Sequence, residues 1–371
     1  MSDDRLLSTF LDLVRIDSPT GFEAACGAYC AEKLRSLGFT VRFDDSASAT
    51  GSDTGNLIAE LPGTGPGVLA LSAHLDCVEP CRGVVPRVED GIVVAESETV
   101  LGADDKAGLA AALEAIERLV ESGGPRPKLK ALFSVQEEVG LIGAKYYTAV
   151  DAACDLCLVL DAEGSPGGIV TAAPTHYTFA AEFFGRASHA GVAPERGVSA
   201  ILMVTDAISR MRLGRLDDAT TANVGTIRGG TATNVIAARC DVTGECRSLD
   251  RAVVEALKAE MDSALRAAAD EAGGSVDVVW TREYEGFVYP DDSPLVALVA
   301  DGCHAAGIEP RTFRTGGGSD ANVFAGKGIP VLALACGMRG VHGVHEQIAV
   351  ADLVALTHIC VAVAERMAEE R

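Results

Sequence analysis

Short, almost wholly apolar runs alternate with segments of helical spacing through the first 170 or so residues of the chain. The runs Gly67–Asp76 (GVLALSAHLD) and Leu156–Leu160 are typical of strands that are covered on both faces. Helical spacing over Leu6–Val14 and Lys106–Val120 separates such runs, and the same alternation returns after Pro294. This pattern predicts an α/β domain with a mixed, mostly parallel sheet covered by helices on both faces.

The middle of the chain has a different pattern. Strand-like segments are expected over 177–184, 221–227, 239–247 and 275–283, with helices over 199–211 and 251–272. The order β-α-β-β-α-β is that of a ferredoxin-like unit. We therefore expect an inserted α+β ferredoxin-like domain at 173–285, within a discontinuous first domain formed by 1–172 and 286–371.

Composition excludes several classes of protein. The chain has 371 residues, 48% of them hydrophobic, and 53 acidic against 31 basic residues give a net charge of −22. Such a charge repels nucleic acid and anionic membranes but attracts cations, so we expect no nucleic-acid or membrane partner. The N-terminal segment lacks the order of a signal peptide, which predicts a cytoplasmic protein. The 11 cysteines, Cys77 and Cys81 among them, are expected to be reduced packing residues.

Ionisable residues follow the apolar runs or lie at a helix start. They occur in SAHLD (His74, Asp76), GADDKAG (Asp104, Asp105), SVQEEVG (Glu137, Glu138), LVLDAEG (Asp161) and GVHGVHE (His342, His345, Glu346). Each has an ordinary explanation when taken alone, such as a helix N-cap or a core histidine. Ligands of open α/β sheets bind at the carboxyl ends of strands, so we expect the five groups to meet at one end of the sheet.

The charges of such a cluster require compensation. Asp104, Glu138 and Asp161 would repel one another if they were packed closely. Two divalent cations and a bridging hydroxide would neutralise these three carboxylates beside two neutral imidazoles. Imidazole and carboxylate ligands suit Zn²⁺, with Mn²⁺ or Co²⁺ as substitutes. Metal-assisted amide hydrolysis is the resulting hypothesis.

Two pairs of residues add detail to this hypothesis. His74 and Asp76 lie two apart in an expected strand, so Asp76 should face the same way and accept the second ring proton of His74. Glu137 and Glu138 are adjacent and should diverge. One of them would then bind metal while the other acts as general base and later as general acid.

The motifs SAHLD, LGADDKAG, QEEVGLIGAK, SHAG, GGTATNVI, GGGSDAN and HGVHE occur in this order over nearly the whole chain. In this the chain resembles the co-catalytic zinc metallopeptidases of the M20 clan, specifically their peptidase T-like group. The resemblance implies that His74, Asp104 and Asp161 hold one zinc ion. It also implies that Asp104 bridges to a second zinc ion, which Glu138 and His342 bind. Asp104 is preferred to Asp105, and His342 to His345, because they match the positions of the family's ligands.

The resemblance implies further roles in catalysis and assembly. Glu137 would be the catalytic base and Asp76 an active-site residue behind the metal. The inserted domain would be a lid that also forms a homodimer. In it, His189 would stabilise the oxyanion, Arg247 would bind the substrate's terminal carboxylate, and Asn234 would lie near the cleft.

Three functions remain open on this reading. The first is a dizinc aminopeptidase of short peptides, similar to a tripeptidase. The second is a related amidohydrolase, namely an N-acyl amino acid deacylase or a carboxypeptidase, with the same metal centre. The third is a non-catalytic metal-binding protein, which the presence of both Glu137 and Glu138 disfavours because a binding module needs no general base.

Overall fold

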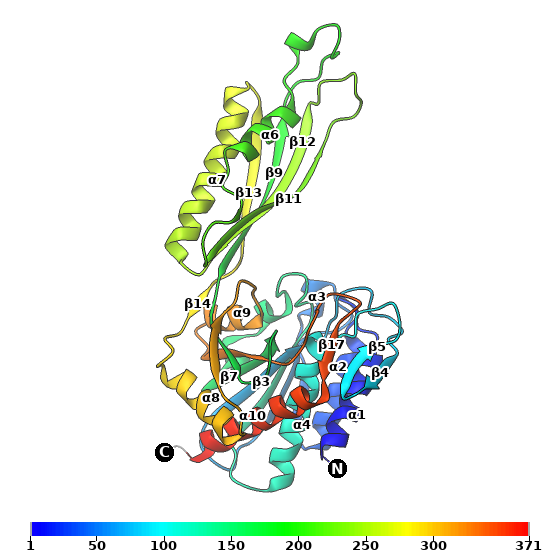
Figure 1. Cartoon of the computed structure of the whole chain (residues 1–371), viewed down its shortest axis with the longest axis vertical. Helices are drawn as coiled ribbons and strands as arrows, with labels where there is room; N and C mark the ends of the chain where they lie inside the picture. Colours follow the sequence, from blue (N-terminus) through cyan, green and yellow to red (C-terminus); the bar gives the residue numbers. More distant parts are fainter. Residues whose placement is uncertain (1, 370–371) are drawn as a thin grey trace. The chain divides into compact units, whose positions relative to one another are not determined.

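The computed structural model describes residues 2–369, whose strands form separate sheets in two units of the chain (Figure 1). Unit 1 takes its described residues from 1–172, 289–314 and 319–371. Unit 2 consists of Ala173–Val288 and Thr315–Gly318. Unit 2 is therefore an insertion in the sequence of unit 1.

The central sheet of unit 1 has the strand order β1-β2-β6-β3-β7-β16-β8, and β15 also pairs with β8. Its strands are β1 (Thr40–Phe43), β2 (Leu57–Leu61), β3 (Val68–His74), β6 (Lys128–Ser134), β7 (Leu156–Ala162), β8 (Gly168–Ala173), β15 (Arg311–Arg314) and β16 (Val331–Ala335). The four central strands β6, β3, β7 and β16 run parallel, whereas β1, β2 and β8 join by antiparallel pairing. The predicted mixed, mostly parallel sheet is confirmed.

Helices flank this sheet, as predicted. They are α1 (Ser2–Arg15), α2 (Ala24–Ser36), α3 (Ala47–Thr50), α4 (Ala103–Ser122), α5 (Ala149–Ala152), α8 (Pro294–Ala305), α9 (Asp320–Gly326) and α10 (Val350–Glu369), with a 3₁₀ turn η1 (Gly143–Tyr146). Helix α4 packs on β3 and β7, and α9 packs on β16. No helix among residues 2–369 is both long and apolar enough to cross a membrane.

The close approach of α4 to the sheet depends on one glycine. A Cβ atom at Gly108 would lie 2.2 Å from the main-chain oxygen of Leu160 in β7. Only glycine therefore allows this part of α4 to lie so near the strand. This contact fixes the start of α4 relative to the end of β7, where two candidate ligands lie.

Some strands were not expected from the sequence. A small sheet of order β17-β5-β4 contains β4 (Pro86–Glu89), β5 (Ile92–Ala95) and β17 (Gln347–Ala349). Helix α10 therefore begins only at Val350, because Ile348 pairs with Val93 in this sheet. Three- and four-residue strands are too short for their pattern to separate them from loops. Strand β8 is buried but was not predicted, because glycine and proline residues precede and follow it in the sequence.

Unit 2 contains an antiparallel sheet of order β10-β11-β12-β9-β13 (Figure 1). Its elements are β9 (Thr175–Phe184), η2 (Pro194–Arg196), α6 (Ala200–Ser209), β10 (Gly214–Arg215), β11 (Thr220–Gly229), β12 (Arg239–Ser248), α7 (Arg251–Glu271), β13 (Ser275–Tyr284) and β14 (Phe287–Val288). Helix α7 begins where the carboxylate of Asp250 accepts hydrogen bonds from the main-chain N–H groups of Ala252 and Val253. Helices α6 and α7 both pack on the sheet, which gives the predicted ferredoxin-like arrangement.

A buried ion cluster joins α1 to α4. The Glu114 side chain is 1% exposed, and its two oxygens lie 2.8 Å from Arg5 Nε and 2.7 Å from Arg118 Nε. Arg5 also contacts Glu121, whose side chain is 54% exposed. We expect Glu114→Gln to lower the free energy of unfolding by about 2–3 kcal/mol, because two guanidinium groups lose their buried counter-charge.

The matched variant is Glu121→Gln, which removes the negative charge of an exposed partner of the same arginine, Arg5. It should cost much less than Glu114→Gln, because water replaces an exposed partner. Urea unfolding of both variants at neutral pH measures the difference. Equal losses would contradict the importance of the buried cluster.

Candidate metal centre

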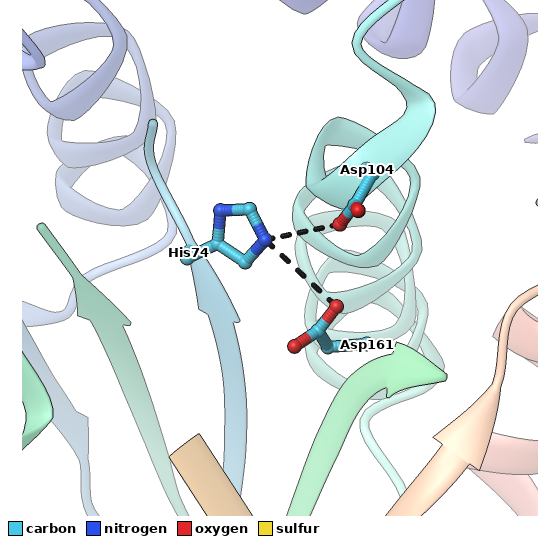
Figure 2. Close-up of side chains that lie close together, drawn as sticks. All are labelled: His74, Asp104 and Asp161. Carbon is cyan, nitrogen blue, oxygen red and sulfur yellow. Dashed lines mark hydrogen bonds and ion pairs between the residues drawn. The ribbon is translucent and has the colours of Figure 1, made fainter. Parts of the chain in front are cut away.

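Three candidate ligands meet where β3, β7 and α4 come together (Figure 2). His74 is the last residue of β3, Asp161 lies near the end of β7, and Asp104 lies near the start of α4. His74 Nε2 lies 3.0 Å from Asp104 Oδ1 and 3.8 Å from Asp161 Oδ1. These three groups form a first set whose ligand atoms lie within 4.8 Å of one another.

A second set of ligands shares Asp104 with the first. His342 Nε2 lies 3.2 Å from Asp104 Oδ2 and 3.0 Å from Glu138 Oε2. The ligand atoms of Asp104, Glu138 and His342 again lie within 4.8 Å of one another. Asp104 therefore directs one oxygen toward each set, which is the geometry of a bridging carboxylate. All five predicted ligand residues are brought together.

The segment that carries Glu137 and Glu138 is fastened by Asp76. The Asp76 carboxylate accepts hydrogen bonds from the main-chain N–H groups of Glu137, at 3.0 Å, and Glu138, at 3.4 Å. It also accepts a hydrogen bond of 2.8 Å from the Thr20 hydroxyl. Gln136, just before this pair, has a φ of 53°, which is uncommon for a residue other than glycine. The chain thus turns sharply after β6, and Asp76 holds the turned segment in place.

The prediction that His74 and Asp76 share a strand face is wrong. Strand β3 ends at His74, so Asp76 lies in the following loop. The nearest partner of His74 Nδ1 is the main-chain oxygen of Asp76 at 2.9 Å, and Asp76 Oδ1 is 3.4 Å away. The loop brings both oxygens toward the ring, so Asp76 orients His74 through its backbone as well as its side chain.

Two carboxylates of the cluster lie in an unfavourable environment for negative charge, whereas Asp104 does not: burial alone would raise its pKa, but its hydrogen bonds with His342 and His74 lower that pKa below its usual value. Burial raises the pKa of Asp161 well above its usual value, and the charges of Glu137 and Asp104 raise it further. Burial likewise raises the pKa of Glu137 well above its usual value, with added repulsion from Asp320 and Glu138. Such a cluster needs protons or cations to be stable.

The two histidines respond to the same charges. Burial alone would lower the pKa of His74, but its contacts with Asp104 and Asp76 raise it well above the usual value. Hydrogen bonds with Asp104 and Glu138 raise the pKa of His342 to about 10. Without metal, both imidazoles are therefore held in the protonated form that neutralises their acidic neighbours.

These residues fit a pair of divalent cations. The donor set of two imidazoles and three carboxylates is the one that Zn²⁺ and Mn²⁺ accept. Glu138 Oε1 is buried without a hydrogen-bond partner, so it has an unsatisfied lone pair at the second set. Two cations would satisfy this oxygen and cancel the repulsion among the carboxylates.

Asp105 and His345, the alternatives to Asp104 and His342, belong to neither set of candidate ligands. The carboxylate of Asp105 accepts hydrogen bonds of 3.1 Å from the main-chain N–H groups of His74 and Gly108, so it faces into the protein. His345 is exposed and belongs to neither set of candidate ligands. Cys77 and Cys81 pack with Val100 beside the segment that leads to Asp104, in agreement with a packing role.

The three predicted substrate-binding residues all belong to unit 2. His189 and Asn234 are exposed neighbours, because the main-chain N–H of Ala190 donates to the main-chain oxygen of Asn234 at 2.9 Å. Arg247 lies at the other end of β12 from this pair. Its guanidinium donates to Glu245 at 2.8 Å and to the Tyr284 hydroxyl at 3.2 Å, so it already has partners within unit 2.

Sequence reasoning did not name Thr20 or Ser134, and it assigned no role to Glu346 although it placed Glu346 among the ionisable residues of the cluster. Thr20 supports Asp76, and Ser134 donates its hydroxyl hydrogen to the buried carboxylate of Asp320. Glu346 is buried and accepts hydrogen bonds from the segment that carries Asp104. A sequence feature exists only for Glu346, which ends the motif GVHGVHE.

Comparisons with known proteins identify the family of the chain. A model of peptidase family M20/M25/M40 matches residues 70–366. The uncharacterized protein YqjE of Bacillus subtilis is 40% identical over 370 residues, which cover 100% of both chains. The crystal structure of aminopeptidase PepT from Bacillus cereus matches with a TM-score of 0.93 and 40% identity over 99% of each chain. A tripeptidase from Staphylococcus aureus matches with a TM-score of 0.95 and 34% identity, also over 99% of each chain.

The raised pKa values predict that cation binding releases protons. With its pKa near 10, His342 is protonated at about pH 8 in the metal-free protein, so a cation must displace that proton. Affinity for Mn²⁺ or Zn²⁺ should therefore rise as the pH increases toward 10. Calorimetric titrations in buffers of different ionisation enthalpy measure the protons released.

The variant His342→Ala should release fewer protons, while His345→Ala, altered in the same loop, should release the wild-type number. Apparent binding enthalpies that do not depend on the buffer would contradict the prediction.

Proposed function

The chain belongs to peptidase family M20/M25/M40 and is a peptidase, and from this premise we propose that it is an aminopeptidase that removes N-terminal residues from short peptides. The observation that carries the proposal is the pair of ligand sets joined by Asp104, with Glu137 beside them. The choice of an aminopeptidase is supported by two solved structures that match at 34–40% identity, one of an aminopeptidase and the other of a tripeptidase.

We propose two Zn²⁺ ions per chain, with Mn²⁺ or Co²⁺ as substitutes. His74, Asp104 and Asp161 would hold one ion, and Asp104, Glu138 and His342 the other. When bound, such ions lower the pKa of water and polarise the carbonyl group of the bond to be cleaved. The shared Asp104 would set the separation of the two ions.

Glu137 is the proposed general base. It is 9% exposed, and a carboxylate beside the two ligand sets can gain and then lose a proton during each turnover. Its carboxylate would take a proton from the attacking water as the new C–O bond forms. It would then give that proton to the leaving nitrogen as the C–N bond breaks. Asp76 would hold Glu137 in position through the main-chain hydrogen bond.

Unit 2 is the proposed lid, and unit 1 the catalytic domain. His189 Nδ1 accepts a hydrogen bond of 3.2 Å from the main-chain N–H of Gly191, so a neutral ring carries its proton on Nε2. That N–H is a suitable donor to an oxyanion. Arg247 would bind a substrate carboxylate in competition with Glu245, and Asn234 would lie at the cleft. The homodimer through unit 2 stays a prediction, which sedimentation velocity would check.

The variant Glu137→Gln tests the mechanism. It should lower kcat by about 10²–10⁴-fold, because a neutral amide cannot accept the proton of the attacking water. Metal content should stay near the wild-type value, since Glu137 is not a proposed ligand. Glu365→Gln, the same change on the exposed surface of α10, is the control and should leave both quantities unchanged. Loss of metal from Glu137→Gln would show that base and ligand are misassigned.

A substrate panel tests the proposed activity. Di- and tripeptides with a free N-terminus should be hydrolysed in the presence of Zn²⁺, Mn²⁺ or Co²⁺, and their N-acetylated forms should not. Tripeptides amidated at the C-terminus test whether hydrolysis requires a free carboxylate at that end as well as a free N-terminus. Cleavage of N-acetylated amino acids would favour a deacylase, and release of the C-terminal residue from blocked peptides would favour a carboxypeptidase.

A further inference from the structure

A single buried carboxylate connects the two segments that carry ligands of the second set. Glu346 is 2% exposed. Its Oε2 accepts a hydrogen bond of 2.7 Å from the main-chain N–H of Gly102, and its Oε1 accepts one of 2.9 Å from the main-chain N–H of Asp104. Glu346 follows His342 by four residues, so one side chain joins the His342 loop to the start of α4.

The segment at the start of α4 offers main-chain donors to this carboxylate. The backbone there is not regular helix, because Asp104 has a φ of −80° and a ψ of 104° and Asp105 is also non-helical. Gly102 adopts a φ of 74° and, as glycine, has no side chain that could accept a hydrogen bond from these N–H groups. The two N–H groups held by Glu346 flank Ala103, so the carboxylate fixes the main chain of Asp104 directly.

The His342 loop has little packing of its own at the ligand. The His342 side chain is 53% exposed, whereas those of Asp104 and Glu138 are 13% and 6% exposed. The loop is closed at its base by two main-chain hydrogen bonds of 3.0 Å between Arg339 and Gln347. His342 itself has a φ of 63°, a conformation that surrounding structure must maintain.

We propose that Glu346 is a positioning residue for the second cation: its two hydrogen bonds set the separation of Asp104 from His342 and so the affinity of the Asp104–Glu138–His342 site. The inference rests on the dinuclear centre of the proposed function. It predicts a larger effect on the second cation, because Asp104 belongs to both sets but the His342 loop that Glu346 holds contributes only to the second. His74 is held by Asp76 and by Asp105, and neither contact involves Glu346.

The test is Glu346→Gln in the full-length protein, with Mn²⁺ as the probe. Glutamine keeps one acceptor but places an NH₂ group against a main-chain N–H, which removes one of the two hydrogen bonds. Equilibrium dialysis with metal analysis should give two Mn²⁺ per wild-type chain. In the variant, the Kd of one ion should rise by about 10–100-fold while that of the other stays within about 3-fold.

Activity gives a second readout that a general loss of structure would not reproduce. The Mn²⁺ concentration for half-maximal activity should rise in Glu346→Gln, and kcat should recover at saturating Mn²⁺. His345→Ala, an exposed change in the same loop, is the control and should bind both ions as the wild type does. Thermal unfolding of the metal-free variants checks that each one folds.

The outcomes separate the two proposals. If the wild-type chain binds two ions and Glu346→Gln binds both with unchanged affinity, the role of Glu346 is wrong and the proposed function stands. Equal weakening of both ions in the variant would also overturn that role. A wild-type chain that binds fewer than two ions would overturn the dinuclear centre, and the inference with it.

Discussion

The repulsion among buried carboxylates around Asp104 is the constraint on which this structure depends. Asp104, Glu138 and Asp161 are placed by α4, the turn after β6, and β7, so the parallel sheet forces them together. Burial and the charges of neighbouring carboxylates raise the pKa of Asp161 well above its usual value, whereas the contacts of Asp104 with His342 and His74 lower its pKa despite its burial. The fold tolerates the arrangement because two imidazoles face the same point and because divalent cations suit the remaining charge. Stability and function are therefore set by the same groups.

Hydrogen bonds between buried carboxylates and the main chain fix the positions of the residues in this cluster. Asp76 holds the segment of Glu137 and Glu138, Asp105 holds the backbone of His74, and Glu346 holds that of Asp104. In each case a buried carboxylate accepts main-chain N–H groups, which are fixed in direction by the backbone. Acidic residues thus serve both as candidate ligands and as anchors, and only their surroundings distinguish the two uses.

Much of this could be predicted from the sequence because the apolar runs are long and continuous. Runs such as Val68–His74 identify buried strands, and the polar residues at their ends must then meet at one side of the sheet. The choice of Asp104 over Asp105 came from a family resemblance, and the structure gives it a physical basis in the inward hydrogen bonds of Asp105. The short strands β4, β5 and β17 lay below the length at which a pattern is recognisable. The bond between Glu346 and Asp104 joins residues 242 positions apart, which no local pattern encodes.

The order of the ligands along the chain has a consequence for biosynthesis. His74, Asp104 and Asp161 all precede unit 2, whereas His342 lies beyond it. A ribosome therefore completes the first set of donors long before it reaches the last histidine of the second. The second set is therefore complete only when the C-terminal segment has been synthesised and has folded against the residues made before unit 2.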